Sequence, residues 1–276
     1  MNARIGTIDT PLMTVTAATL GSGPALVYLH DVLFDMPRPD GADVPDHLQA
    51  LGVAHSIIAP WLPGFRDLAQ LKAVAELDDY LFVLTDFLAA ASPARPHLVG
   101  AGLGGWLAAE LAVRRPDKIA TLTLVNAFGL KVDGHPTARF FDAAAPNPLG
   151  GRREIRELLF TEPDGELATK VLPDFPDSGP GMEFFTNVHA AAQIGWSPPA
   201  FYDPKLTRHL HRIDVPTQIV WGAANKLVDL AHAEAFVAGI EGATLHVIDG
   251  AGHLLHVERP GELAATIIAH TSQHAS

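Results

Sequence analysis

Residues 97–112 read HLVGAGLGGWLAAELA, and this stretch decides the fold. It begins as an apolar strand, passes through the turn Gly100-Ala101-Gly102-Leu103-Gly104, and continues as an alanine-rich helix that we expect to end near Arg115. Further strand-like runs alternate with helical stretches on both sides of it. Strands that alternate with helices favour a mostly parallel sheet that is covered by helices on both faces.

The glycine-rich turn has the spacing of the nucleophile elbow, G-x-S-x-G, in which a tight strand-to-helix turn presents a serine above the sheet. In this chain the serine position holds Gly102. The other serines do not follow a strand in such a turn; they are Ser22, Ser56, Ser92, Ser178, Ser197, Ser272 and Ser276. We therefore expect no covalent acyl-serine chemistry.

Three further segments, in chain order around this turn, resemble one known family. ALVYLH (25–30) is a buried-type strand that ends in a histidine, PTQIVWGAANKLVD (216–229) resembles a strand and acid-bearing loop, and LHVIDGAGHLLHVERP (245–260) resembles a histidine-bearing loop. The order of elbow, acid and histidine is that of the α/β-hydrolase superfamily, which the chain resembles over nearly its whole length. It departs from the family pattern at Gly102, Asn225 and Asp31, where Ser, Asp and Gly are usual.

The resemblance implies an α/β-hydrolase fold with a mostly parallel sheet of about eight strands, helices on both faces and a helical cap. We expect residues 1–128 and 213–276 to form the core. Residues 129–212 carry many prolines and glycines, short helical pieces and several aromatic residues. They are expected to form the cap that closes over an apolar pocket.

The same resemblance names the candidate catalytic residues. His253 is expected to lie over the elbow and act as a base, while Gly102 leaves the nucleophile position without a side chain. The carbonyl of Asn225 is expected to orient His253 by accepting from Nδ1–H, without stabilising an imidazolium by charge. A second acid position of the superfamily is occupied by another amide, Asn126.

The oxyanion hole is expected to be formed by the backbone N–H groups of Val32 and Leu103, the latter at a helix N-terminus. Asp31 leaves two alternatives open. Its carboxylate points inward, where it repels an oxyanion or acts as a new acid or base, or it points outward as a loop residue. Substrate-binding positions are expected at His30, Asp31, Phe128 and Trp196.

The composition limits the classes of partner. The net charge of −12 argues against nucleic acid and anionic membranes, and apolar runs are too short for a membrane span. There is no cysteine, and the first residues lack a basic patch followed by an apolar block. We expect a cytoplasmic protein with a small-molecule substrate and with neither a cofactor nor a metal, since no metal cluster, phosphate loop or dinucleotide fingerprint is present. Whether it forms a homodimer stays open.

Three functions compete. The first is a cofactor-independent enzyme whose His253 moves a proton in lyase, cyclase, isomerase or decarboxylase chemistry, with backbone N–H groups holding an enolate or alkoxide. The second is a non-catalytic protein that keeps the pocket and binds a small molecule. The third is an ester or C–C hydrolase inactivated by mutation, which is less favoured because several positions depart from the family pattern together.

Overall fold

The computed structural model describes residues 2–33, 35–38, 40–92, 94–144, 152–174, 180–196 and 200–274. The described chain contains an eight-stranded sheet with the order β1-β2-β4-β3-β5-β6-β7-β8. Its strands are β1 Arg4–Asp9, β2 Thr14–Gly21, β3 Ala25–Leu29, β4 Ser56–Pro60, β5 His97–Ala101, β6 Thr121–Val125, β7 Thr217–Gly222 and β8 Thr244–Ile248.

The sheet is mostly parallel. Strands β3 to β8 pair in parallel, whereas β2 pairs antiparallel with both β1 and β4. The predicted α/β-hydrolase fold class is therefore confirmed. Strand β1 could not be predicted from the sequence, because RIGTID is a largely exposed edge strand without an apolar run.

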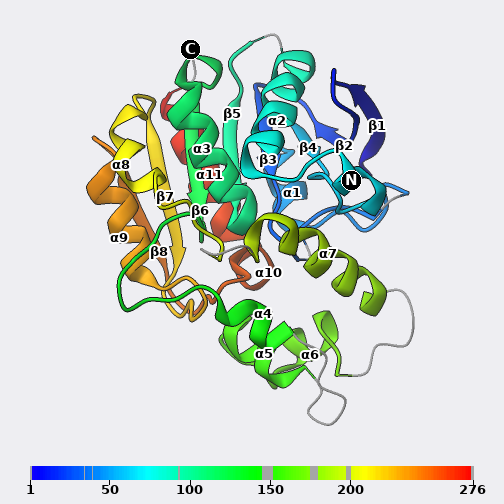
Figure 1. Ribbon diagram of the computed structural model, residues 1–276, viewed down its shortest axis with the longest axis vertical. Helices are drawn as coiled ribbons and strands as arrows, with labels where there is room; N and C mark the ends of the chain where they lie inside the picture. Colours follow the sequence, from blue (N-terminus) through cyan, green and yellow to red (C-terminus); the bar gives the residue numbers. More distant parts are fainter. Residues whose placement is uncertain are drawn as a thin grey trace.

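Helices cover both faces of the sheet. Figure 1 shows α2 (Leu77–Ala91) and α3 (Gly102–Arg114) in front of it, with α1 (Asp46–Leu51) and α11 (Pro260–Gln273) behind. The remaining core helices are α9 (Leu230–Gly239), α10 (Leu255–Glu258) and the short η1 (Leu68–Lys72) and η2 (Pro116–Lys118). Because the central strands are enclosed on both sides, β5, β6 and β7 are buried along their whole length.

The segment between β6 and β7 is helical in its described parts. It contains α4 (Arg139–Ala144), α5 (Arg153–Leu159), α6 (Glu166–Val171), α7 (Pro180–Gly195), α8 (Leu206–His209) and η3 (Leu210–Arg212). Helices α4, α5 and α6 gather at one end of the molecule (Figure 1). The last two pieces contact core helices instead, α8 packing on α9 and η3 on α3.

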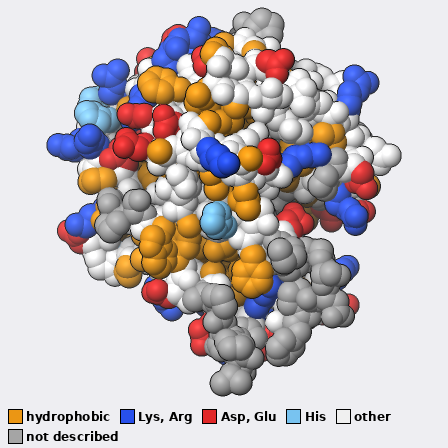
Figure 2. Space-filling view, turned by 45° about the vertical axis from the view of Figure 1, so that its right-hand side comes forward, with side chains coloured by type: hydrophobic (Ala, Val, Ile, Leu, Met, Phe, Trp, Pro, Cys, Tyr) orange, Lys and Arg blue, Asp and Glu red, His pale blue; other side chains and the backbone are white. Residues whose placement is uncertain are grey.

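The surface carries charges of both signs. On the face in Figure 2, acidic and basic side chains are interspersed, while hydrophobic side chains gather in its lower half. No helix within the described ranges is both long enough and apolar enough to cross a membrane.

Candidate functional site

The turn between β5 and α3 requires glycine at two positions for different reasons. Gly102 has a φ of +48°, in the left-handed region that glycine adopts without strain. A Cβ on Gly104 would lie 2.2 Å from the carbonyl oxygen of Leu29, so the helix start can approach β3 this closely only with glycine there. The turn therefore brings the first N–H groups of α3 against the loop that follows β3.

Asp31 in that loop points inward and fills the space above Gly102. Its side chain is buried, and a Cβ on Gly102 would lie only 1.8 Å from its Oδ1. Oδ1 accepts hydrogen bonds from the N–H groups of Val32 at 2.7 Å and Leu103 at 3.0 Å. Oδ2 lies 3.1 Å from Nε2 of His253. One carboxylate thus contacts the two N–H groups expected to form an oxyanion hole and the histidine expected to be catalytic.

The surroundings keep Asp31 ionised. Burial alone raises the pKa of a carboxyl group, but here the charge and N–H of His253 outweigh it, assisted by the charge of His256 and the N–H of Leu103. Together they lower the pKa of Asp31 to about 2. Leu103 lies in the first turn of α3, where the helix dipole also favours a negative charge. Asp31 is therefore an anion throughout the physiological pH range.

His30 fixes the backbone on which Asp31 stands. Its Nε2 accepts from the N–H of Leu62 at 2.9 Å, and its Nδ1 lies 2.6 Å from the carbonyl oxygen of Asp31. Burial lowers the pKa of His30 to about 4, against the opposing effect of its contacts with Asp31. The neutral ring thus accepts at Nε2 and donates from Nδ1. His30 acts as a positioning residue for Asp31, and it also lines the cavity beside it.

The loop that carries His253 is held from two sides. The side-chain amide of Asn126 donates to the carbonyl oxygens of Gly252 (3.0 Å) and His253 (2.7 Å), while its own oxygen accepts from the N–H of Gly222 at 2.9 Å. Glu258 accepts from the N–H of Gly252 at 2.6 Å and from the N–H of Thr161 at 2.8 Å. These hydrogen bonds hold the loop that carries His253 against the end of β7 and against the helical segment between β6 and β7.

Asn225 does not orient His253 in the way the sequence predicted. Its Oδ1 accepts from the N–H groups of Leu227 at 3.1 Å and Val228 at 3.0 Å. Nδ2 of Asn225 and Nδ1 of His253 are both buried without a hydrogen-bond partner among the described residues. The expectation of a bond from His253 to the Asn225 carbonyl is therefore wrong, because backbone N–H groups of its own turn occupy that oxygen. The group that holds His253 is Asp31, on the other ring nitrogen.

The two aromatic residues expected to bind substrate lie at different distances from the site. The ring of Phe128 is 5.3 Å from that of His253 and is buried. A stack of aromatic rings runs outward from it, with Phe128 on Phe201 at 4.3 Å and Phe201 on Phe141 at 4.8 Å. Trp196 contacts the outer end of this stack and is 59% exposed. It does not reach the Asp31–His253 pair, because the three rings of the stack lie between them.

A small cavity of about 30 Å³ adjoins Asp31. It is lined by Asp31, Asp35, Trp61, Phe65 and, from α7, Glu183 and Asn187, together with His30, Val32 and Met36. Asp35 was not identified from the sequence. The only signal was its position four residues after Asp31 in the same loop, which does not reveal the direction of either side chain.

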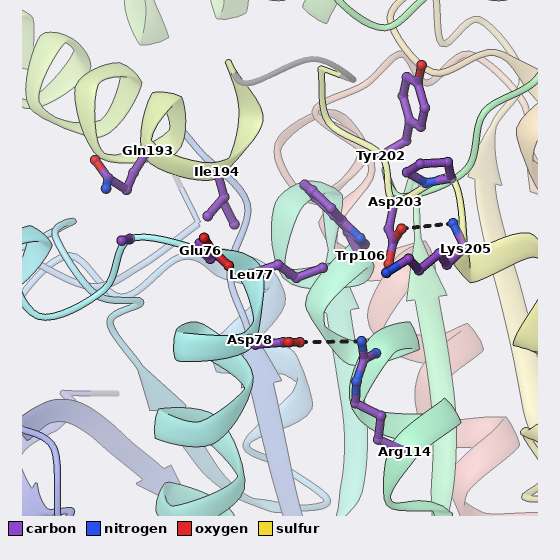
Figure 3. A pocket seen from close by; sticks show the side chains of 12 residues that line it. Glu76, Leu77, Asp78, Trp106, Arg114, Gln193, Ile194, Tyr202, Asp203 and Lys205 are labelled. Carbon is purple, nitrogen blue, oxygen red and sulfur yellow. Dashed lines mark hydrogen bonds and ion pairs between the residues drawn. The ribbon is translucent and has the colours of Figure 1, made fainter.

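A larger pocket of about 420 Å³ lies elsewhere, between the start of α2, Trp106 of α3, the end of α7 and residues 202–205 (Figure 3). Two of its carboxylates have partners in the lining. Arg114 lies 3.5 Å from Asp78, and the side chain of Asp203 accepts from the N–H of Lys205 at 2.8 Å. It includes neither Asp31 nor His253, so we place the candidate site at the smaller cavity. Within the described ranges, His, Asp and Glu side chains form no group of three that could hold a metal ion.

Comparisons with known proteins agree with this architecture. The chain is 27% identical over 226 residues to the dihydrolipoyllysine-residue acetyltransferase component of the acetoin cleaving system of Cupriavidus necator, covering 81% of this chain and 58% of that protein. It is 27% identical over 183 residues to monoacylglycerol lipase abhd6-A of Xenopus laevis, covering 61% and 52%. The chain thus spans little more than half the length of these relatives.

Among solved structures, a naproxen esterase from Bacillus subtilis has a TM-score of 0.72 at 16% identity, over 97% of this chain and 90% of that one. A membrane phospholipase A has a TM-score of 0.73 at 21% identity, over 99% and 86%. At these identities the likeness shows the fold alone. The family model described as "Alpha/beta hydrolase family" matches residues 26–266. From the sheet order, the turn at Gly102 and this match, the chain belongs to the alpha/beta hydrolase family.

Proposed function

We propose that this protein is an enzyme that moves protons on a small organic substrate, in lyase, cyclase or isomerase chemistry, with the Asp31–His253 pair as its acid–base centre. The observation that supports the proposal is the placement of Asp31. Its carboxylate bonds to the Val32 and Leu103 N–H groups and to His253 Nε2, in the space that Gly102 leaves. Where the family carries a nucleophilic serine, this site holds a second ionisable group.

The resting site determines which atoms exchange the proton. Because Asp31 is ionised, the proton between the two groups resides on Nε2 of His253, which donates to Oδ2. From the sequence, His253 alone is expected to be the base. With Nε2 directed at Asp31, the proposal assigns proton uptake to the pair, through the carboxylate that lines the cavity.

Inactivation of an ordinary hydrolase by mutation accounts for this site less well. A side chain at position 102 and the inward Asp31 exclude one another, since even a Cβ would lie 1.8 Å from the carboxylate. If an ordinary hydrolase had lost only its serine to glycine, position 31 would still hold the glycine that is usual in the family. No carboxylate would then lie against the two backbone N–H groups. The two residues are complementary, which supports a site that diverged as a unit.

A binding protein without catalysis is the second candidate, favoured by two observations. The chain's own carboxylate occupies both N–H groups, and the adjoining cavity of about 30 Å³ is small. On this account Asp31 and His253 form a stable internal pair that never exchanges a proton with a ligand.

Exchange of carbon-bound hydrogen in D₂O separates the two candidates without knowledge of the native product. Ketones, β-keto acids and β-hydroxy ketones would be incubated with wild type, Asp31→Asn and His253→Gln, and deuterium uptake followed by NMR. The proposal predicts uptake into at least one compound by wild type and loss of about 100-fold or more in both variants, the range expected for acid–base groups. If folded wild type exchanges none of these compounds faster than buffer alone does, the enzyme proposal fails and the binding function remains.

A further inference from the structure

The Asp31–His253 pair can accept a proton, but it does not supply a hydrogen-bond donor to the substrate. Removing a proton beside a carbonyl group places negative charge on the carbonyl oxygen, and enzymes stabilise that charge with directed hydrogen-bond donors. In this site the N–H groups of Val32 and Leu103 both donate to Oδ1 of Asp31. They are therefore not free for a substrate oxygen, and the expectation that they hold an enolate is wrong for this arrangement. Another donor has to face the cavity.

Asp35 lines the same cavity as Asp31 and, unlike the amide of Asn187 in the same lining, can give up a proton as well as donate a hydrogen bond. Its side chain is buried. Its Oδ2 accepts from the N–H of Asp31 at 2.6 Å and from the hydroxyl of Tyr28 at 3.2 Å. A proton on this carboxyl group therefore belongs on the other oxygen, Oδ1, since two donors already point at Oδ2.

The surroundings favour the protonated form. Burial, followed by the negative charge of Asp31, raises the pKa of Asp35 well above its usual range, and the hydrogen bonds that the carboxyl group accepts reverse only part of this. Two carboxyl groups of one loop thus differ in charge, with Asp31 ionised and Asp35 neutral. Neighbouring titratable groups whose pKa values are driven apart are the usual arrangement of an acid and a base in one site.

We propose that Asp35 is a second catalytic residue, which donates its Oδ1 proton to the carbonyl oxygen of a small, uncharged carbonyl compound bound beside Asp31. This inference rests on the proposed proton-transfer function and names its acid and its substrate class. The Asp31–His253 pair takes the proton from the carbon next to the carbonyl group, and Asp35 gives one to the oxygen. One proton enters and one leaves the protein, the C–H electron pair becomes the C=C bond, and the product is the enol.

The cavity suits an uncharged substrate. Asp31 is anionic, and Glu183 of α7 adds a second carboxylate to the lining, so an anionic substrate would be repelled. Trp61 and Phe65 add aromatic side chains to the lining. The volume of about 30 Å³ restricts the substrate to a few heavy atoms.

The test compares deuterium uptake from D₂O into acetone and hydroxyacetone by wild type, Asp35→Asn and Asp133→Asn. Asparagine keeps an oxygen to accept from Asp31 N–H and Tyr28 but cannot deliver a proton, whereas the Asp133 side chain is 94% exposed and serves as the matched control. We expect Asp35→Asn to lower the uptake rate about 100-fold and Asp133→Asn to leave it within about twofold. Equal rates in wild type and Asp35→Asn would overturn the role of Asp35 while leaving the Asp31–His253 function standing. No uptake by wild type would overturn both.

Infrared spectroscopy of the wild-type protein gives a second readout that is independent of turnover and of whether the variant folds. A protonated carboxyl group has a C=O stretching band that an ionised one lacks. Because the pKa of Asp35 is raised well above its usual range, we expect a buried carboxylic-acid band from this group at neutral pH. Absence of that band at neutral pH would overturn the inference about Asp35 alone.

Discussion

At the scale of single residues, Gly102 and Asp31 occupy one volume between them. This makes the outcome of restoring the elbow serine predictable. We expect Gly102→Ser alone to give no ester hydrolysis and to lower stability, because its Cβ would meet the Asp31 carboxylate at 1.8 Å. The measurement is covalent labelling by a fluorophosphonate probe together with the unfolding midpoint in urea.

The triple variant Asp31→Gly, Gly102→Ser, Asn225→Asp is the matched comparison. It removes the carboxylate from the two N–H groups, supplies a nucleophile and restores the acid that the family usually carries at position 225. We expect the probe to label position 102 in the triple variant only. Labelling of the single variant would show that Asp31 leaves the site readily.

Asn126 permits a second prediction at this scale. Its amide donates to two carbonyl oxygens of the histidine loop, so Asn126→Asp would place a carboxylate against those oxygens. Asn126 has a φ of +46°, which Asp tolerates as Asn does, so the change adds no backbone strain. We expect a loss of about 2–4 kcal/mol in the free energy of unfolding. The exposed Asn2→Asp is the control, and equal stability of the two variants would contradict this role.

The sequence predicted some of these residues and not others for a physical reason. Gly102, His253, Val32 and Leu103 follow from a motif whose backbone geometry is fixed by its spacing. The direction of Asp31 depends on space made 71 residues further along the chain, and no local pattern records it. For Asn225 the oxygen accepts from the backbone N–H groups of Leu227 and Val228 in its own turn, and no local pattern shows that these donors take the place of His253.

At the scale of secondary-structure elements, the site forms where loops leave the carboxyl ends of adjacent parallel strands. The loops after β3, β5, β6 and β8 carry Asp31, Gly102, Asn126 and His253 respectively. Such convergence is a property of parallel sheets, so the location of the site could be predicted from strand order. Strand order does not predict how the aromatic side chains of the segment between β6 and β7 pack. Trp196 accordingly lies farther from the Asp31–His253 pair than its position in the sequence suggested.

Glu258 joins the loop that carries His253 to the helical segment between β6 and β7, and this connection gives the prediction at the scale of elements. Glu258 joins Gly252 to Thr161, and Glu258→Ala would leave two backbone N–H groups without their acceptor. We expect a loss of about 1–3 kcal/mol in the free energy of unfolding, measured in urea. Glu262→Ala, on the exposed start of α11, is the control. If both variants unfolded alike, Glu258 would not hold the loop.

At the scale of the whole molecule, several buried histidines have lowered pKa values, and they outnumber Asp35, whose raised pKa acts on stability in the opposite direction. These histidines therefore set the response to acid. Burial lowers the pKa values of His30 and His256 to about 4, below the 6.5 of an unperturbed histidine. Between these values the unfolded chain binds more protons than the folded one, so stability falls as the pH drops from 6.5 to 4. The free energy of unfolding in urea should decrease in steps as the buffer is taken from about pH 7.5 to about pH 6 and then to about pH 5. A constant value would contradict the buried, neutral state of these rings.

An ionised Asp31 occupies the place of the missing serine side chain, between two backbone N–H groups and His253. Titration of the Asp31 carboxyl carbon by ¹³C NMR, assigned with Asp31→Asn, tests this arrangement most directly. We predict a pKa of about 2, below the 3.8 of an unperturbed aspartate. A pKa of Asp31 at or above 3.8 would mean that the carboxylate lacks these partners, and it would contradict the account.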